Sequence, residues 1–218
     1  MIILKNWQHK TYPGIGYNYW VSYPENYCSD KKYPLIIFLH GAGEVGPNPE
    51  AVRAHGVPKI IDSAPYSEIE AITVSPQCPA GRMWFAEYDF LRQFILDIIP
   101  EYNIDEDAVS ITGLSMGGYS TFIMAQLWPE IFAAAAPICG GGIPWIADRL
   151  KDMPLRIYHG DIDSVVPVSG SIEMCDRIHA AGNKDCELIL LHNVDHNSWD
   201  YAYERTDLIC WLSKQRRK

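Results

Sequence analysis

The pentapeptide at 113–117, Gly-Leu-Ser-Met-Gly, places Ser115 between two glycines, directly after the run 109–112, which is rich in β-branched residues. A serine that follows a strand and precedes a helix in this way is typical of a nucleophile elbow. Glycines are needed beside it because side chains there would collide with the adjoining strand and helix. A serine hydroxyl is a weak nucleophile, so it needs a base within hydrogen-bond reach and an acid that orients the base. The pentapeptide alone also arises by chance, and its context decides whether it is catalytic.

Two stretches that follow Ser115 carry acids and then bases, each directly after an apolar run of strand length. The candidate acids are Asp161 and Asp163, and the candidate bases are His192 and His196. Because ligands bind at the carboxyl ends of the strands in open α/β sheets, we expect these side chains to lie near the serine. The i,i+4 spacing of the two histidines is also typical of a metal pair. The residues between them indicate a loop rather than a helix, so we predict no metal site there.

Apolar runs of strand length alternate along the chain with amphipathic stretches of helix length. This alternation predicts an α/β fold with a mostly parallel central sheet and helices on both faces. The expected strands are 2–5, 17–23, 35–39, 71–74, 109–112, 132–138, 155–158 and 186–191, and the expected helices are 85–99, 119–127, 169–181 and 199–213. The segment 139–154 is too short for a cap domain, and no linker or repeat interrupts the chain. We therefore expect a single domain over residues 1–218.

Composition limits the classes of partner. The net charge of -9 disfavours nucleic acid, and no apolar run approaches the roughly 18 residues of a membrane span. The N-terminus lacks the apolar core of a signal peptide, so the sequence as it stands predicts a cytoplasmic protein; a mature secreted enzyme with a new initiator Met would look the same. The six cysteines include no C-x-x-C pair, which disfavours a zinc site and favours mostly reduced, buried thiols.

In these motifs the chain resembles the α/β-hydrolase superfamily, most closely its small carboxylesterases without a cap: dienelactone-hydrolase-like esterases, feruloyl and acetyl esterases of carbohydrate esterase family 1, and the related "predicted peptidase" group. The resemblance is carried by His40-Gly41-Ala42-Gly43-Glu44, Gly113–Gly118, His159-Gly160 with Asp163 and Val166-Pro167, and His196 with Trp199. It implies that Ser115 is the nucleophile, Asp163 the acid and His196 the base. Asp161 then has a turn-forming or capping role.

The resemblance also implies an oxyanion hole made of two backbone N–H groups. One belongs to Met116, which follows the nucleophile, and the other to Ala42 in the loop after the strand 35–39. His40 is expected to support this loop, and Glu44 either orients it or is solvated. No cofactor and no metal is implied.

The expected activity is hydrolysis of carboxylic esters through an acyl-enzyme intermediate. Feruloyl or acetyl esters of plant polysaccharides are the expected substrates, either as small molecules or as polymers. Trp84, Trp145 and Gln77 are the candidate residues of the substrate pocket. Two alternatives stay open: a serine peptidase or amidase of the same fold, and a catalytically silent binding protein on that fold.

Overall fold

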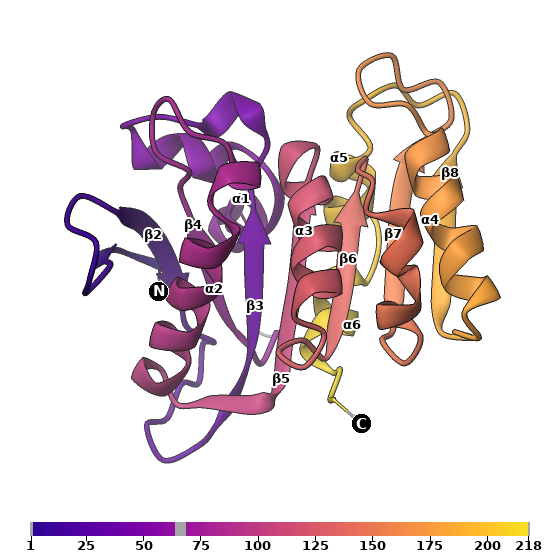
Figure 1. Cartoon of the computed structure of the whole chain (residues 1–218). Coiled ribbons are helices and arrows are strands. Elements are labelled where there is room, and N and C mark those ends of the chain that lie inside the picture. Colours follow the sequence, from indigo (N-terminus) through magenta and orange to yellow (C-terminus); the bar gives the residue numbers. More distant parts are fainter. Residues whose placement is uncertain (1, 64–68, 218) are drawn as a thin grey trace.

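The computed structural model describes residues 2–63 and 69–217, which fold around an eight-stranded sheet of order β1-β2-β4-β3-β5-β6-β7-β8 (Figure 1). The strands are β1 (Ile2–Gln8), β2 (Gly16–Ser22), β3 (Tyr33–Leu39), β4 (Ile72–Pro76), β5 (Ile104–Leu114), β6 (Ala134–Ile138), β7 (Leu155–Gly160) and β8 (Cys186–Leu191). β2 pairs antiparallel with β1 and with β4, and every other pairing is parallel. The predicted, mostly parallel sheet is confirmed.

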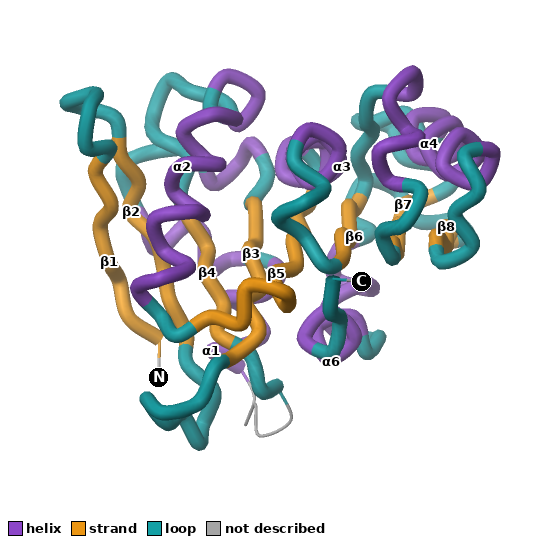
Figure 2. The backbone as a smooth tube through the Cα atoms, turned by 60° about the horizontal axis from the view of Figure 1, so that its bottom comes forward, coloured by secondary structure: helices purple, strands orange, loops and turns teal. Residues whose placement is uncertain are grey.

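Helices cover both faces of the sheet (Figure 2). One face carries α2 (Tyr88–Ile98), α3 (Met116–Leu127) and α4 (Ser169–Ala180), and the other carries α1 (Gly56–Ser63), α5 (Trp199–Glu204) and α6 (Leu208–Ser213). Each face has its own apolar core, the first containing Phe94 and Phe122 and the second Val57 and Leu212. β3 lies between the two cores and is buried at all seven positions, which explains its unbroken apolar run.

The register of the parallel strands brings the ends of distant segments to one edge of the sheet. Leu39 at the end of β3 pairs with Gly113 in β5, and Gly160 at the end of β7 pairs with Leu191 at the end of β8. The loop after β3 therefore lies beside the turn after β5, and the two loops after β7 and β8 lie beside each other. β3 and β5 also form the point where the strand order reverses, which is where open α/β sheets bind ligands.

Three elements differ most from the sequence predictions. The expected helix 199–213 is two helices, α5 and α6, because the Thr206 hydroxyl donates to the Ala202 carbonyl and accepts from the Leu208 amide, which ends one helix and begins the next. The α1 helix was not predicted; it starts at Gly56, whose φ of 63° only glycine adopts at low cost. Strand 109–112 extends to the whole of β5.

Residues 139–154 contain a short 3₁₀ helix (Pro144–Leu150) and no cap domain, as expected. Within residues 2–63 and 69–217, no helix is both long enough and apolar enough to cross a membrane.

Candidate active site

Ser115 is the single residue between the end of β5 and the start of α3. Its φ of 54° and ψ of -115° lie in a region that non-glycine residues rarely adopt, and its amide donates to the Ile138 carbonyl at 3.0 Å. A Cβ atom on Gly117 would lie 1.9 Å from the Leu39 carbonyl oxygen, so only glycine lets α3 approach β3 this closely. The chain at 113–117 thus forms the sharp strand-to-helix turn that the sequence predicts.

Ser115, His196 and Asp163 form a continuous chain of hydrogen bonds. The Ser115 Oγ lies 2.9 Å from His196 Nε2, and His196 Nδ1 lies 2.8 Å from Asp163 Oδ2. A carboxylate oxygen can only accept, so Nδ1 carries the imidazole proton and Nε2 presents its lone pair to the hydroxyl. This arrangement matches a nucleophile with its base and the acid that orients the base.

The Asp163 side chain is fully buried, and its second oxygen, Oδ1, accepts hydrogen bonds from the amides of Val165 and Val166 at 2.9 and 2.8 Å. Burial by itself would raise the pKa of Asp163. The hydrogen bonds from His196 and from the two amides stabilise the anion more strongly, and they hold the pKa of this carboxyl below its ordinary value. Asp163 is therefore a carboxylate at neutral pH.

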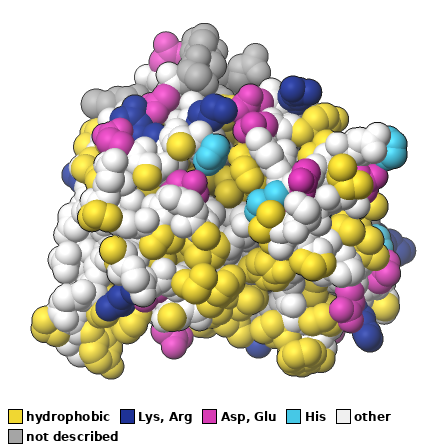
Figure 3. Space-filling model, turned by 90° about the horizontal axis from the view of Figure 1, so that it is seen from above, with side chains coloured by type: hydrophobic (Ala, Val, Ile, Leu, Met, Phe, Trp, Pro, Cys, Tyr) yellow, Lys and Arg dark blue, Asp and Glu magenta, His cyan; other side chains and the backbone are white. Residues whose placement is uncertain are grey.

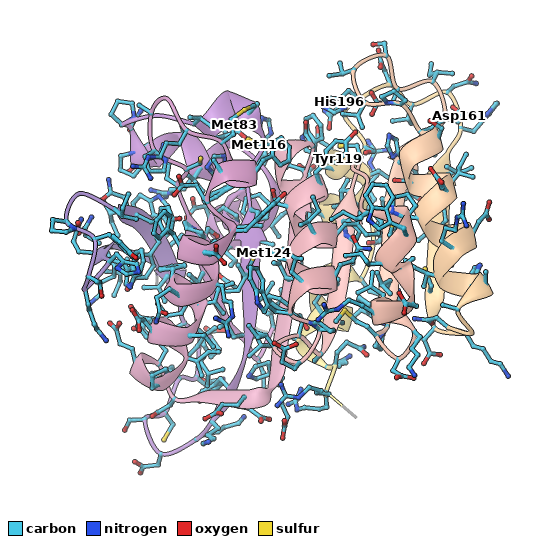
Figure 4. The ribbon with its side chains drawn as sticks, viewed as in Figure 1. Met83, Met116, Tyr119, Met124, Asp161 and His196 are labelled. Carbon is cyan, nitrogen blue, oxygen red and sulfur yellow. The ribbon has the colours of Figure 1, made fainter. Side chains whose placement is uncertain are left out.

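The alternative acid and the alternative base pair with each other. Asp161 Oδ2 lies 2.9 Å from His192 Nδ1, and its Oδ1 accepts from the Asn193 amide. The His192 side chain is 84% exposed, whereas that of His196 is 18% exposed. Figure 4 shows His196 near the end of α3 and Asp161 farther out on the C-terminal part of the molecule.

Asp195 joins the two loops that carry Asp163 and His196. Its Oδ1 accepts from the amide and the hydroxyl of Ser164 at 2.7 and 2.9 Å and from the His196 amide at 2.8 Å. Each of these partners is a catalytic candidate or directly follows one. The carboxylate therefore fixes the relative position of the acid and the base.

The two amides expected in the oxyanion hole both open a helix. Met116 is the first residue of α3, and Ala42 is the first residue of the 3₁₀ helix Ala42–Glu44 that follows β3. Amides in a first helical turn have no carbonyl partner within their own helix, so they are available to an anion. Figure 4 places Met116 at the end of α3 that faces His196. Figure 3 views this end of the molecule, where histidine side chains lie among hydrophobic ones.

His40 is 1% exposed and supports the loop after β3, as the resemblance implies. Its Nε2 accepts from the Cys78 amide at 2.9 Å, and its Nδ1 donates to the Gly41 carbonyl at 2.6 Å. Burial disfavours the charged ring and lowers the pKa of His40 to about 4. The ring is therefore neutral at physiological pH and keeps an acceptor for Cys78.

We expect the free energy of unfolding to fall as the pH drops from about 6.5 to about 4. In this window the unfolded chain takes up a proton at residue 40 that the native chain does not, which costs about 3 kcal/mol across the window. Burial also lowers the pKa of His159, which acts in the same direction. Urea unfolding at several pH values measures how the free energy of unfolding changes with pH. NMR signals of the histidine rings, followed over the same pH range, show whether His40 is the residue responsible. A His40 ring that titrates near pH 6.5 in the native protein would contradict this prediction.

Two of the three residues proposed for the substrate pocket are structural. Trp84 is fully buried, and its Nε1 donates to the His40 carbonyl at 3.2 Å. Gln77 is 3% exposed, and its amide donates to the carbonyls of Glu44 and Asn48. Both hold the loop after β3 and offer no surface to a substrate, so these two predictions were wrong. Trp145 is 83% exposed at the surface.

Glu44 is buried rather than solvated, with its carboxylate 3.8 Å from His40 Nδ1 and 3.9 Å from His55 Nε2.

Three further residues lie next to the hydrogen-bonded chain of Ser115, His196 and Asp163. The Trp199 ring meets the His196 ring edge-on at 5.3 Å, and the charge of Asp163 contributes, after burial, to a raised pKa of Tyr119. The Cys139 sulfur and the nearest ligand atoms of Asp163 and His196 all lie within 4.8 Å of one another. Burial raises the pKa of the Cys139 thiol to about 12.

The chain is similar to known esterases. A solved thermostable esterase superposes with a TM-score of 0.89 at 31% identity, covering 99% of this chain and 63% of that one. A probable feruloyl esterase C of Aspergillus terreus is 28% identical over 79% of this chain and 63% of its own length. A poly(3-hydroxyalkanoate) depolymerase C of Paucimonas lemoignei is 32% identical over 50% of this chain and 28% of its own length. The chain thus spans less than two thirds of each relative.

The α/β-hydrolase fold without a cap, implied by the motifs, is confirmed by the superposition with the thermostable esterase and by the strand order. The Esterase family model, described as "Putative esterase", matches residues 14–152, which is more than half of the chain. That match contains the loop after β3, the whole of β5 and the serine turn. The chain therefore belongs to the Esterase family.

Proposed function

We propose that the protein is a serine carboxylic ester hydrolase that acts through an acyl-enzyme intermediate. The observation that carries the proposal is the chain of hydrogen bonds from Ser115 through His196 to Asp163. Ser115 Oγ attacks the ester carbonyl while His196 Nε2 takes its proton, and Asp163 stabilises the imidazolium. The amides of Met116 and Ala42 stabilise the oxyanion. His196 then protonates the departing alcohol, and it activates the water that releases the acid.

We further propose feruloyl or acetyl esters of plant polysaccharides as the substrates. With no cap in the described residues, the site can admit a bulky alcohol. Phe85 is 44% exposed and packs edge-on against Tyr119 at 6.0 Å, and the Tyr119 amide donates to the Ser115 carbonyl at 3.0 Å. Phe85 also lines a surface cavity of about 340 Å³ together with Tyr12 and Tyr88. An aromatic surface of this kind suits a feruloyl ring, and the Aspergillus relative named a feruloyl esterase supports the same class.

The test is turnover of a substrate panel combined with active-site labelling. We expect hydrolysis of methyl ferulate, acetylated xylan or both, together with short p-nitrophenyl esters, and we expect a fluorophosphonate probe to label Ser115. Labelling requires an activated serine, so it excludes a catalytically silent protein. The panel also contains poly(3-hydroxybutyrate) and a blocked peptide.

Three results would contradict the proposal at different levels. Labelling of Ser115 with turnover only of the peptide would indicate a peptidase of the same fold. Turnover of the polyester with no turnover of the plant-type esters would keep the mechanism and overturn the substrate class. If Ser115 is not labelled and no substrate of the panel is turned over, the proposal that the protein is a serine hydrolase is wrong.

A further inference from the structure

We propose that Cys175, His179 and Cys186 form a binding site for a thiophilic cation, Zn²⁺, that is separate from the catalytic residues. Their three ligand atoms lie within 4.8 Å of one another. Cys175 and His179 are one helical turn apart on α4, and Cys186 is the first residue of β8. Cys186 lies at the amino end of β8, whereas Ser115 and His196 follow the carboxyl ends of β5 and β8. The strands β5 to β8 are parallel, so the proposed site lies at the opposite end of the strands from the catalytic residues (Figure 1).

The spacing of the ligand atoms suits tetrahedral zinc. The Cys175 and Cys186 sulfurs are 4.0 Å apart, and Cys175 Sγ lies 3.8 Å from His179 Nδ1. Zn–S bonds of about 2.3 Å and Zn–N bonds of about 2.05 Å at the tetrahedral angle require separations of about 3.8 and about 3.6 Å. These two separations are each longer by only about 0.2 Å. The third pair, Cys186 Sγ and His179 Nδ1, lies within 4.8 Å, so the exposed His179 side chain has to rotate to bring all three ligand atoms onto one cation.

The imidazole of His179 is oriented as a ligand. Its Nε2 lies 2.8 Å from the carbonyl oxygen of Cys186, which can only accept, so Nε2 carries the proton. The lone pair on Nδ1 then points towards the Cys175 sulfur. Histidines that bind metals almost always donate their other N–H to a carbonyl or a carboxylate in this way.

The charge balance also favours a divalent cation. Both thiols are buried. On binding, two S–H bonds break, two Zn–S bonds and one Zn–N bond form, and two protons leave to solvent. The two thiolates neutralise the cation, so the filled site carries no net charge. His179 is exposed, which leaves the fourth position open to a water molecule.

The sequence does not reveal this site because no C-x-x-C pair marks it. Packing of α4 on β8 brings the ligands together across the turn 181–185. Among the described residues, one other cluster has side chains that could bind a metal: Cys139, Asp163 and His196. We do not propose a metal there, because its histidine is already hydrogen-bonded on both sides. Both ring nitrogens of His196 there bond to Ser115 and Asp163.

The experiment is metal binding by the reduced full chain. We expect one Zn²⁺ per chain after equilibrium dialysis, and release of two protons per Zn²⁺ in calorimetry across buffers of different ionisation enthalpy. Co²⁺ in place of Zn²⁺ is expected to show sulfur-to-cobalt charge transfer in the near ultraviolet. Free Zn²⁺ about a hundredfold above its Kd is expected to raise Tm by about 6 °C.

Cys175→Ser and Cys186→Ser are expected to weaken binding about a hundredfold or more, and the exposed His179→Gln about tenfold to a hundredfold. Cys28→Ser and Cys210→Ser change cysteines outside the cluster and are the matched controls. The proposal is overturned if the wild-type chain binds Zn²⁺ no better than Cys175→Ser and His179→Gln. It is equally overturned if the two sulfurs form a disulfide and the protein binds no Zn²⁺ after reduction. Neither result bears on ester hydrolysis, because the readouts are metal content, proton release and absorption.

Discussion

Ser115→Ala will lower kcat for ester hydrolysis by about 10⁶-fold while the protein stays folded. The substitution removes the only atom that can form the acyl bond, and His196 Nε2, now without its partner at 2.9 Å, has no hydroxyl to deprotonate. The oxyanion amides and substrate binding remain, so a residual rate above that in water is expected. The measurement is kcat on p-nitrophenyl acetate, with urea unfolding of both proteins.

The matched control is Ser120→Ala, one turn further along α3. The Ser120 hydroxyl is buried and donates to the Met116 carbonyl at 2.9 Å, so its loss affects the helix and not the reacting atoms. We expect a loss of about 1 kcal/mol in stability and little change in kcat. A Ser115→Ala protein that keeps more than about 1% of the wild-type kcat, after contaminating esterase is excluded, would show that another residue is the nucleophile.

Much of this site could be predicted from the sequence because its parts follow strand ends. A buried parallel strand has an unbroken apolar run, so the ends of β3, β5, β7 and β8 can be located and the polar residues after them assigned to one edge. Residues alone left Asp161 and His192 open, because all four candidates occupy equivalent loops. Their separation depends on the loop conformations, in which Asp195 joins Ser164 to the His196 amide.

Other features lay beyond sequence patterns. Trp84 and Gln77 each combine an apolar body with a polar end, so residue type alone does not distinguish a buried support from a pocket wall. Their burial results from the path of the chain from 77 to 87 beneath the loop after β3, which has no periodicity. The Cys175 and Cys186 pair likewise depends on how a helix packs on a strand.

Asp163→Asn is expected to lower kcat by about 10⁴-fold with the fold intact. Asp163 Oδ1 accepts from the amides of Val165 and Val166, so the carbonyl oxygen of an asparagine would occupy that place. Its NH₂ group would then face His196 Nδ1, where the native carboxylate oxygen accepts at 2.8 Å. The ring would respond by placing its proton on Nε2, and the base would no longer have a lone pair directed at the serine.

Asp161→Asn separates this tautomer effect from a general loss of negative charge near the site. Asp161 carries the same charge two residues away but bonds to the exposed His192, so its variant is expected to keep kcat close to that of the wild type. Both variants are measured on p-nitrophenyl acetate from pH 6 to pH 10. If the two lost activity equally, electrostatics of the loop rather than ring orientation would be the cause. If Asp161→Asn alone lost it, the acid would be Asp161 and the base His192, because these two side chains are bonded to each other and not to His196.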